Sequence, residues 1–130
     1  MRILKIIHGY PPHYNAGSEI YSQMLCHGLA QQHDVHVLTR EENPFLDDFS
    51  WVIEQDEQKP SITLNKINIP SEKYRYRYQI NQFDQLVKIL LADIQPDIVH
   101  IGHLNHLSSS LVYQIAKKKF LLFIRCTIIG

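Results

Sequence analysis

The chain has 130 residues, 45% of them hydrophobic, which is the size and composition of one globular domain. Its 13 Lys and Arg residues balance its 13 Asp and Glu residues, so the net charge favours neither nucleic acid nor an anionic membrane as a partner. No apolar run approaches the ~20 residues of a membrane span, and no signal peptide precedes the first predicted strand. We therefore expect a cytoplasmic domain, residues 1–130, with at most peripheral membrane contact.

The first forty residues predict a βαβ unit. An apolar strand over 2–8 leads into a loop rich in Pro and Gly over 9–17, then a helix over 18–32 and a strand over 34–39. Ser18 is a plausible N-cap of this helix. The helix is expected to bury the face that carries Ile20, Met24, Leu25 and Leu29, and Gly28 to let it approach the sheet closely.

The remaining elements are predicted from apolar periodicity and breaker residues. They are a strand over 62–69, a helix over 79–95, a strand over 97–101, a helix over 106–118 and a strand over 120–125. Residues 40–60 are polar and turn-rich and predict no regular element. Strands that alternate with helices in this order indicate an α/β fold with a doubly wound, mainly parallel, Rossmann-like sheet.

An alternation of aromatic and basic residues occupies residues 74–78, Tyr-Arg-Tyr-Arg-Tyr. Such a pattern can stack on the bases of a nucleic acid. The neutral net charge favours the other interpretation, amphipathic side chains that cover the protein surface.

Two segments carry candidate ligand-binding residues. The first is the loop from Gly9 to Gly17 together with Glu19, because loops at the carboxyl ends of parallel strands line the binding crevice of α/β sheets. A helix begins there, and its free N–H groups attract anions or polar substrates. An ordinary βα turn also favours Gly and Pro, and spacing alone does not separate the two interpretations.

The second segment is His100-Ile-Gly-His103 with Asn105 and His106. Imidazole orients hydroxyl groups and transfers protons near neutral pH. A zinc site needs a third ligand, and none has convincing spacing, so we expect neither a metal nor another cofactor. The sequence also lacks a Walker loop, a Gly-x-Gly-x-x-Gly fingerprint and a Gly-x-Ser-x-Gly elbow, which argues against a P-loop enzyme, a nicotinamide enzyme and a hydrolase.

Taken together, these motifs resemble the amino-terminal domain of glycosyltransferase family 4, which has the GT-B architecture. The resemblance rests on their order and spacing along most of the chain, apart from residues 41–75. The matching segments are Tyr10-Pro11-Pro12, Ala16-Gly17-Ser18-Glu19, Val35-His-Val-Leu-Thr39 and Pro96-Asp97-Ile-Val-His100-Ile101, followed by His103-Leu104-Asn105 and Leu107-Ser108.

The resemblance implies an acceptor-side domain of a retaining enzyme that moves a sugar from a nucleotide-sugar donor to a saccharide or lipid-linked acceptor. By position, it implies substrate binding by Ala16, Gly17, Glu19, His100, His103 and Asn105. We expect Gly17, His100, His103 and Asn105 to converge on one crevice. Ala16 and Gly102 depart from the family pattern, which more often has Gly and His at these positions.

The family's donor half has no counterpart before the chain ends at Gly130, so we expect a truncated, inactive transferase. The codons for Cys126-Thr-Ile-Ile-Gly130, when read one base out of frame, can encode Leu-His-Asp-Tyr-Trp. That sequence matches the family better. A frameshift near Phe120 would explain the truncation. Two other hypotheses are a subunit of a split transferase, whose donor domain is a separate chain, and a stand-alone flavodoxin-like binding module.

Overall fold

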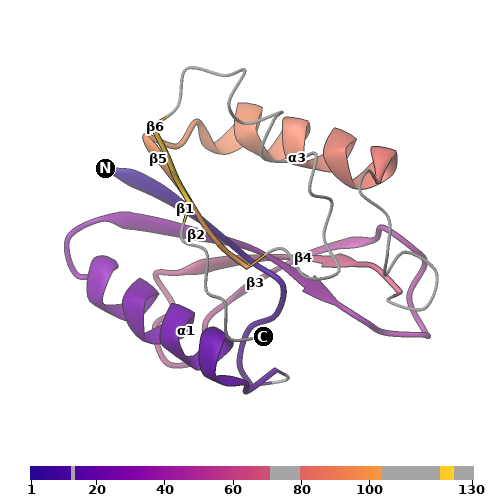
Figure 1. Ribbon diagram of the computed structural model, residues 1–130, viewed down its shortest axis with the longest axis horizontal. Coiled ribbons are helices and arrows are strands. Elements are labelled where there is room, and N and C mark those ends of the chain that lie inside the picture. The colour runs from indigo at the N-terminus through magenta and orange to yellow at the C-terminus, as the bar shows by residue number, and fades with distance from the viewer. Residues whose placement is uncertain (13, 71–79, 104–120, 125–130) are drawn as a thin grey trace.

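A computed structural model describes residues 1–12, 14–70, 80–103 and 121–124. Within these residues, one helix covers each face of a six-stranded sheet (Figure 1). The strands are β1 (Arg2–Ile7), β2 (Asp34–Glu41), β3 (Trp51–Gln55), β4 (Thr63–Asn68), β5 (Ile98–His103) and β6 (Leu121–Ile124). The helices are α1 (Gly17–Leu29) and α3 (Asn81–Ile94).

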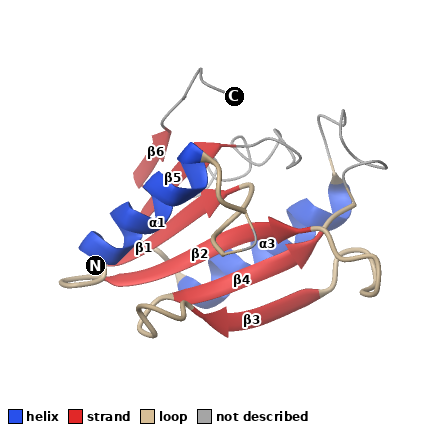
Figure 2. Cartoon of the chain, turned by 90° about the horizontal axis from the view of Figure 1, so that it is seen from below, coloured by secondary structure: helices blue, strands red, loops and turns tan. Residues whose placement is uncertain are grey.

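The strand order is β3-β4-β2-β1-β5-β6, and every neighbouring pair is parallel except β3 with β4 (Figure 2). This confirms the predicted doubly wound, mainly parallel class. The chain leaves β1 in one direction, through α1 to β2. It later returns through α3 to β5 on the other side of β1. The reversal creates a topological switch point between β1 and β5, where ligands bind in such sheets.

The α3 face of the sheet is a continuous apolar layer. Phe83, Val87, Leu90, Leu91 and Ile94 recur at helical spacing, are buried, and pack against β1, β2, β4 and β5 side chains such as Leu4 and Ile101. The helix ends at Gln95, whose left-handed backbone (φ 51°) allows its N–H to bond Leu91 O at 2.9 Å. Pro96 follows, so the helix predicted over 79–95 is confirmed within two residues.

The α1 face differs from the prediction for this helix. Its buried residues are Glu19, Ser22 and Cys26, whereas Ile20 and Met24 are 43% and 68% exposed. The prediction is therefore wrong for Ile20 and Met24, although Leu29 does pack against the apolar cluster on this side of the sheet. Glu19 is buried instead because His8 binds its carboxylate, an interaction that apolar periodicity does not detect. Gly28 is also open, because a Cβ there would meet nothing within 4 Å.

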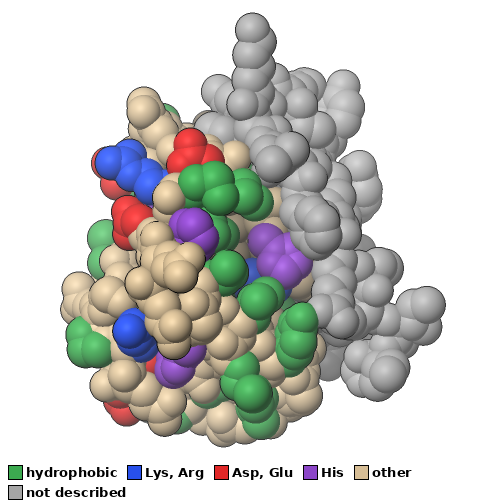
Figure 3. All heavy atoms as spheres, turned by 90° about the vertical axis from the view of Figure 1, so that its left-hand side faces the viewer, with side chains coloured by type: hydrophobic (Ala, Val, Ile, Leu, Met, Phe, Trp, Pro, Cys, Tyr) green, Lys and Arg blue, Asp and Glu red, His purple; other side chains and the backbone are tan. Residues whose placement is uncertain are grey.

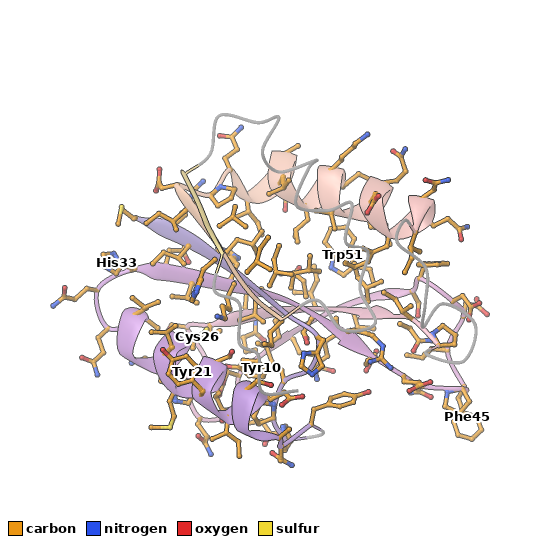
Figure 4. The ribbon with its side chains drawn as sticks, viewed as in Figure 1. Tyr10, Tyr21, Cys26, His33, Phe45 and Trp51 are labelled. Carbon is orange, nitrogen blue, oxygen red and sulfur yellow. The ribbon has the colours of Figure 1, made fainter. Side chains whose placement is uncertain are left out.

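Residues 40–60 contain a strand that the sequence did not predict. β3 is an antiparallel edge strand with exposed residues such as Ile53 and Glu54, so it has no buried apolar run. Trp51, the first residue of β3, and Phe49, which precedes the strand, pack against the α3-face cluster. Phe45 is 93% exposed and points away from the sheet (Figure 4).

Some predictions fall outside the described residues: the helix over 106–118, Asn105, His106 and the aromatic-basic segment 74–78. In the described part of the chain, neither helix has the length and apolar character that a bilayer crossing requires. Figure 3 views the end of the molecule where the N-terminus lies. Cationic and anionic side chains are interspersed there, and hydrophobic side chains gather over α1.

Candidate functional site

The candidate site lies on the α1 side of the switch point. β1 ends at Ile7 and leads into His8 and Gly9, and Ile7 pairs with His103 at the end of β5. Lys5 and His100 are register partners further back along the same two strands. The parallel strands β1 and β5 thus bring two segments, 95 residues apart in sequence, to one place, as the sequence pattern predicted for parallel strands.

A histidine–carboxylate pair joins the first loop to α1. His8 Nε2 lies 2.8 Å from Glu19 Oε1, and both side chains are largely buried, with 15% and 4% exposed. Ser18 Oγ donates to the other carboxylate oxygen at 3.1 Å. Since a carboxylate only accepts, His8 donates from Nε2. Glu19 therefore faces inward and ties the start of α1 to the end of β1.

A lysine–histidine pair lies within the sheet itself. Lys5 and His100 are 2% and 8% exposed, and Lys5 Nζ is 3.1 Å from His100 Nδ1. An ammonium group can only donate, so His100 Nδ1 accepts and its ring proton is on Nε2.

The thiol of Cys26 lies on the buried face of α1, where the charge of Lys5 influences its pKa. Burial raises the pKa of Cys26 to about 12, although the Lys5 ammonium group acts in the opposite direction. The thiol is therefore protonated at neutral pH, and a protonated, buried thiol is a poor nucleophile. Cys26 is a packing residue of this site rather than a reactive one.

Two glycines are required by close packing around these pairs. A Cβ on Gly9 would lie 2.9 Å from Tyr14 Cβ and Cγ and 3.3 Å from Glu19 Oε1. A Cβ on Gly102 would lie 3.0 Å from both Lys5 Nζ and Ile7 Cδ1. Gly102, which departs from the family pattern, therefore leaves room for the Lys5 side chain in this protein.

The start of α1 is open. Ala16 is the N-cap residue, not Ser18 as the sequence suggested, and no side chain caps the helix. Ala16 and Gly17 are exposed, and a Cβ on Gly17 would meet nothing within 4 Å. The first N–H groups of a helix have no partner within the helix and form an anion-binding end. The backbone here is accessible to a ligand.

A second polar cluster, which the sequence did not predict, surrounds the buried carboxylate of Asp56. Its Oδ2 accepts from Tyr10 OH at 2.6 Å and His27 Nε2 at 2.9 Å, with Gln23 Nε2 at 3.4 Å. Burial would raise the pKa of Asp56, but the hydrogen bonds from Tyr10, His27 and the backbone outweigh it and hold the pKa at about 2. Burial and the bond to Asp56 also raise the pKa of Tyr10.

The predicted site residues have different places in the structure. Glu19 and His100 are buried in the two polar pairs, and Ala16 and Gly17 lie exposed at the start of α1. His103 is the last residue of β5, and Asn105 is outside the described residues. Their convergence on one crevice remains a prediction. Lys5 and His8 were not predicted as site residues, since each sits in an ordinary strand pattern and no local motif marks it.

Comparison with known proteins gives one family match and two similar solved structures. The family model described as Glycosyltransferase Family 4 matches residues 15–125. A sucrose-phosphate synthase of Thermosynechococcus elongatus has a similar structure, with a TM-score of 0.63 and 19% identity over 95% of this chain. A trehalose-6-phosphate synthase of E. coli bound with UDP-2-fluoro glucose gives a TM-score of 0.54 and 16% identity, again over 95% of this chain.

This chain spans 32% of the length of each of these two structures. At these identities the likeness shows the fold, a GT-B type domain. A search of the curated proteins found no significant match.

Proposed function

The chain belongs to glycosyltransferase family 4, and from this premise we propose that residues 1–130 are the acceptor-side domain of a retaining transferase. The complete enzyme would move a sugar from a nucleotide-sugar donor to a saccharide or lipid-linked acceptor. The observation that carries this proposal is the open N-terminus of α1 beside the switch point of the sheet. Free backbone donors at this position suit hydroxyl or phosphate oxygens of a substrate.

Within this proposal, the exposed backbone of Ala16 and Gly17 contacts the substrate directly. Glu19 does not contact the substrate. Its carboxylate binds His8 and Ser18, and these bonds fix the first turn of the helix that the substrate contacts. His100 supports the floor of the site through Lys5. His103 and Asn105 line the β5 side of the same crevice, as their positions after a parallel strand suggest.

In this proposal, residues 1–130 supply the acceptor side of the site and not the donor side. Transfer requires donor phosphates held by cationic groups and an acceptor hydroxyl held close to the anomeric carbon. A single open wall leaves such contacts exposed to water, which weakens each of them. We therefore expect no sugar transfer by residues 1–130 alone, and nucleotide-sugar binding no tighter than about millimolar, ~−4 kcal/mol.

Calorimetry and saturation-transfer NMR with common nucleotide sugars and saccharides test this directly. Gly17→Leu should abolish any saccharide signal, because the new side chain covers the open backbone. Gly28→Leu is the matched control, since its Cβ position on the same helix is equally open but lies in the last turn. Micromolar nucleotide-sugar binding, turnover by the 130-residue chain, or equal effects of the two substitutions would contradict the proposal.

The alternative that this chain is one subunit of a split transferase predicts a different experimental result. In that case a separate donor-domain chain would co-purify with this one and restore transfer when mixed with it. The nucleotide sequence downstream of codon 120 distinguishes it from a frameshift, because a frameshift leaves a donor domain in a neighbouring frame of the same gene. A stand-alone binding module would have neither a donor-domain chain nor such a frame.

A further inference from the structure

The Asp56 cluster connects three separate parts of the α1 face. Tyr10 comes from the loop after β1, His27 and Gln23 come from α1, and Asp56 itself follows β3. The other carboxylate oxygen, Oδ1, accepts from the backbone N–H groups of Gln58 at 2.8 Å and Lys59 at 3.1 Å. One carboxylate thus holds the β1 loop, the helix and the β3–β4 turn together.

We infer that Asp56 is a positioning residue: its hydrogen bond to Tyr10 fixes the described part of the β1 loop, residues 10–12 and 14–15, beside the open start of α1. The inference rests on the proposed function only for its consequence, because this loop leads directly into Ala16 and Gly17. The sequence resemblance assigns nothing to Asp56, which lies in the segment 41–75 that the resemblance does not cover.

Packing holds the ring of Tyr10 in the apolar cluster of the α1 face, but it does not close the gap between the loop and the hairpin. A cavity of about 220 Å³ separates Pro11, Pro12 and Asn15 from the hairpin residues Glu54–Gln58. Across this gap, the Tyr10–Asp56 hydrogen bond is a direct connection, and Tyr10 is itself only 2% exposed. Figure 4 shows Tyr10 between α1 and the sheet. Loss of the bond should therefore free the loop without opening the apolar core.

The donors around Asp56 explain why a carboxylate is needed. Both oxygens face N–H or O–H groups: three side-chain donors at Oδ2 and two backbone donors at Oδ1. Asparagine has nearly the same shape but carries an NH₂ group in place of one oxygen. In either orientation, that NH₂ group would face donors, so one set of hydrogen bonds is lost.

The test is hydrogen–deuterium exchange of the 130-residue chain with Asp56→Asn, Tyr10→Phe and the double variant. We expect the amide of Tyr14, which donates to Tyr10 O, to exchange at least ~10-fold faster in each single variant, with no further gain in the double variant, because both variants disrupt the Tyr10–Asp56 hydrogen bond. Amides of α3 should be unchanged. Asp93→Asn, an exposed carboxylate on α3, is the matched control and should leave both regions as they are.

Tyr10→Phe retains the ring, so it keeps the test informative even if Asp56→Asn fails to fold. Unchanged exchange at the Tyr14 amide, or equal acceleration there and in α3, would overturn the inference. Where the wild-type chain binds a saccharide, Tyr10→Phe should weaken that binding at least ~5-fold. A wild-type chain that binds no saccharide contradicts the proposed function and leaves the exchange result to decide the role of Asp56.

Discussion

The two faces of the sheet are built on different principles. On the α3 face, buried apolar side chains such as Phe83 and Leu90 form one continuous layer with the sheet. On the α1 face, the apolar cluster is smaller, and the buried residues include Lys5, Glu19 and His100. Both faces thus enclose an apolar cluster, but the α1 face adds two buried polar pairs, Lys5–His100 and His8–Glu19.

The difference suggests that the α3 face mainly stabilises the domain, whereas the α1 face of the same sheet carries the candidate binding site. Apolar burial stabilises a domain by about 25 cal/mol per Å², whereas a buried polar group costs free energy unless it is hydrogen-bonded. On the α1 face, polar side chains are buried next to the switch point. The hydrogen bonds within the Lys5–His100 and His8–Glu19 pairs offset the free-energy cost of burying them. We therefore expect substitutions on the α3 face to change stability most, and substitutions on the α1 face to change local geometry.

The largest effect is expected for Phe83→Ala on the α3 face. The ring is fully buried, so its removal leaves a cavity and should lower the free energy of unfolding by about 3–5 kcal/mol. Met24→Ala on α1 is the matched control, because that side chain is 68% exposed and should change stability by less than ~0.5 kcal/mol. Denaturant titration measures both. Similar losses for the two variants would contradict the division between the faces.

The pH dependence of stability should identify Asp56. Its pKa falls from the ordinary 3.8 to about 2 in the folded chain, so the unfolded chain binds the proton more readily. This contributes roughly 2 kcal/mol of stability, fully present above about pH 5 and lost as the pH falls through the folded-state value. Unfolding curves between pH 6 and pH 2.5 should be less pH-dependent in Asp56→Asn than in wild type. Parallel curves would refute the assignment.

A smaller effect is expected at Gly9. A methyl group there would meet the root of the Tyr14 side chain at 2.9 Å, so Gly9→Ala should cost about 1–3 kcal/mol of stability. Gly17→Ala, in the same segment but with open space around it, should cost nothing measurable. Thermal unfolding of the two variants compares a closed and an open part of the same loop. Equal melting temperatures would mean that the Gly9 contact relaxes freely.

The smallest effect should have the opposite sign. Gly28→Ala places a methyl group in open space near the end of α1, at a residue without positive φ. Reduced freedom of the unfolded chain should then stabilise the protein by about 0.5–1 kcal/mol. A loss of stability would show that α1 approaches its surroundings more closely than the structure indicates.

Apolar periodicity predicted the α3 face well, because the side chains that its helix buries are apolar apart from Asp84. The same reasoning assigned the wrong face of α1 to the core, since Glu19 and Ser22 are buried by pairing rather than by hydrophobicity. Pairing depends on His8 and other residues that no local pattern connects to the helix. Apolar periodicity also failed to predict β3. This strand is an exposed antiparallel edge strand, and such a strand needs no apolar run.

The sequence indicated which edge of the sheet carries the candidate site, but it did not identify all of the polar residues there. Strand ends and the loop over 9–17 pointed to the switch point, and Glu19 and His100 do lie on its α1 side. Lys5 was hidden within an apolar strand, and Asp56 within a segment that showed only turn residues. Their roles come from contacts between elements that are distant in sequence, so only the folded arrangement reveals them.

The central position of β1 also has a consequence for the order of folding. β1 gains its first neighbour from residues 34–39, but its second neighbour begins at Ile98, where Arg2 N also bonds Asp97 Oδ2 at 2.8 Å. During synthesis, one edge of the innermost strand stays unpaired until nearly one hundred residues have been made. Contacts of such long sequence separation slow folding and leave a strand edge open to aggregation meanwhile. The pairing of β1 with β5 that creates the topological switch point is thus also the step that this chain can complete only late.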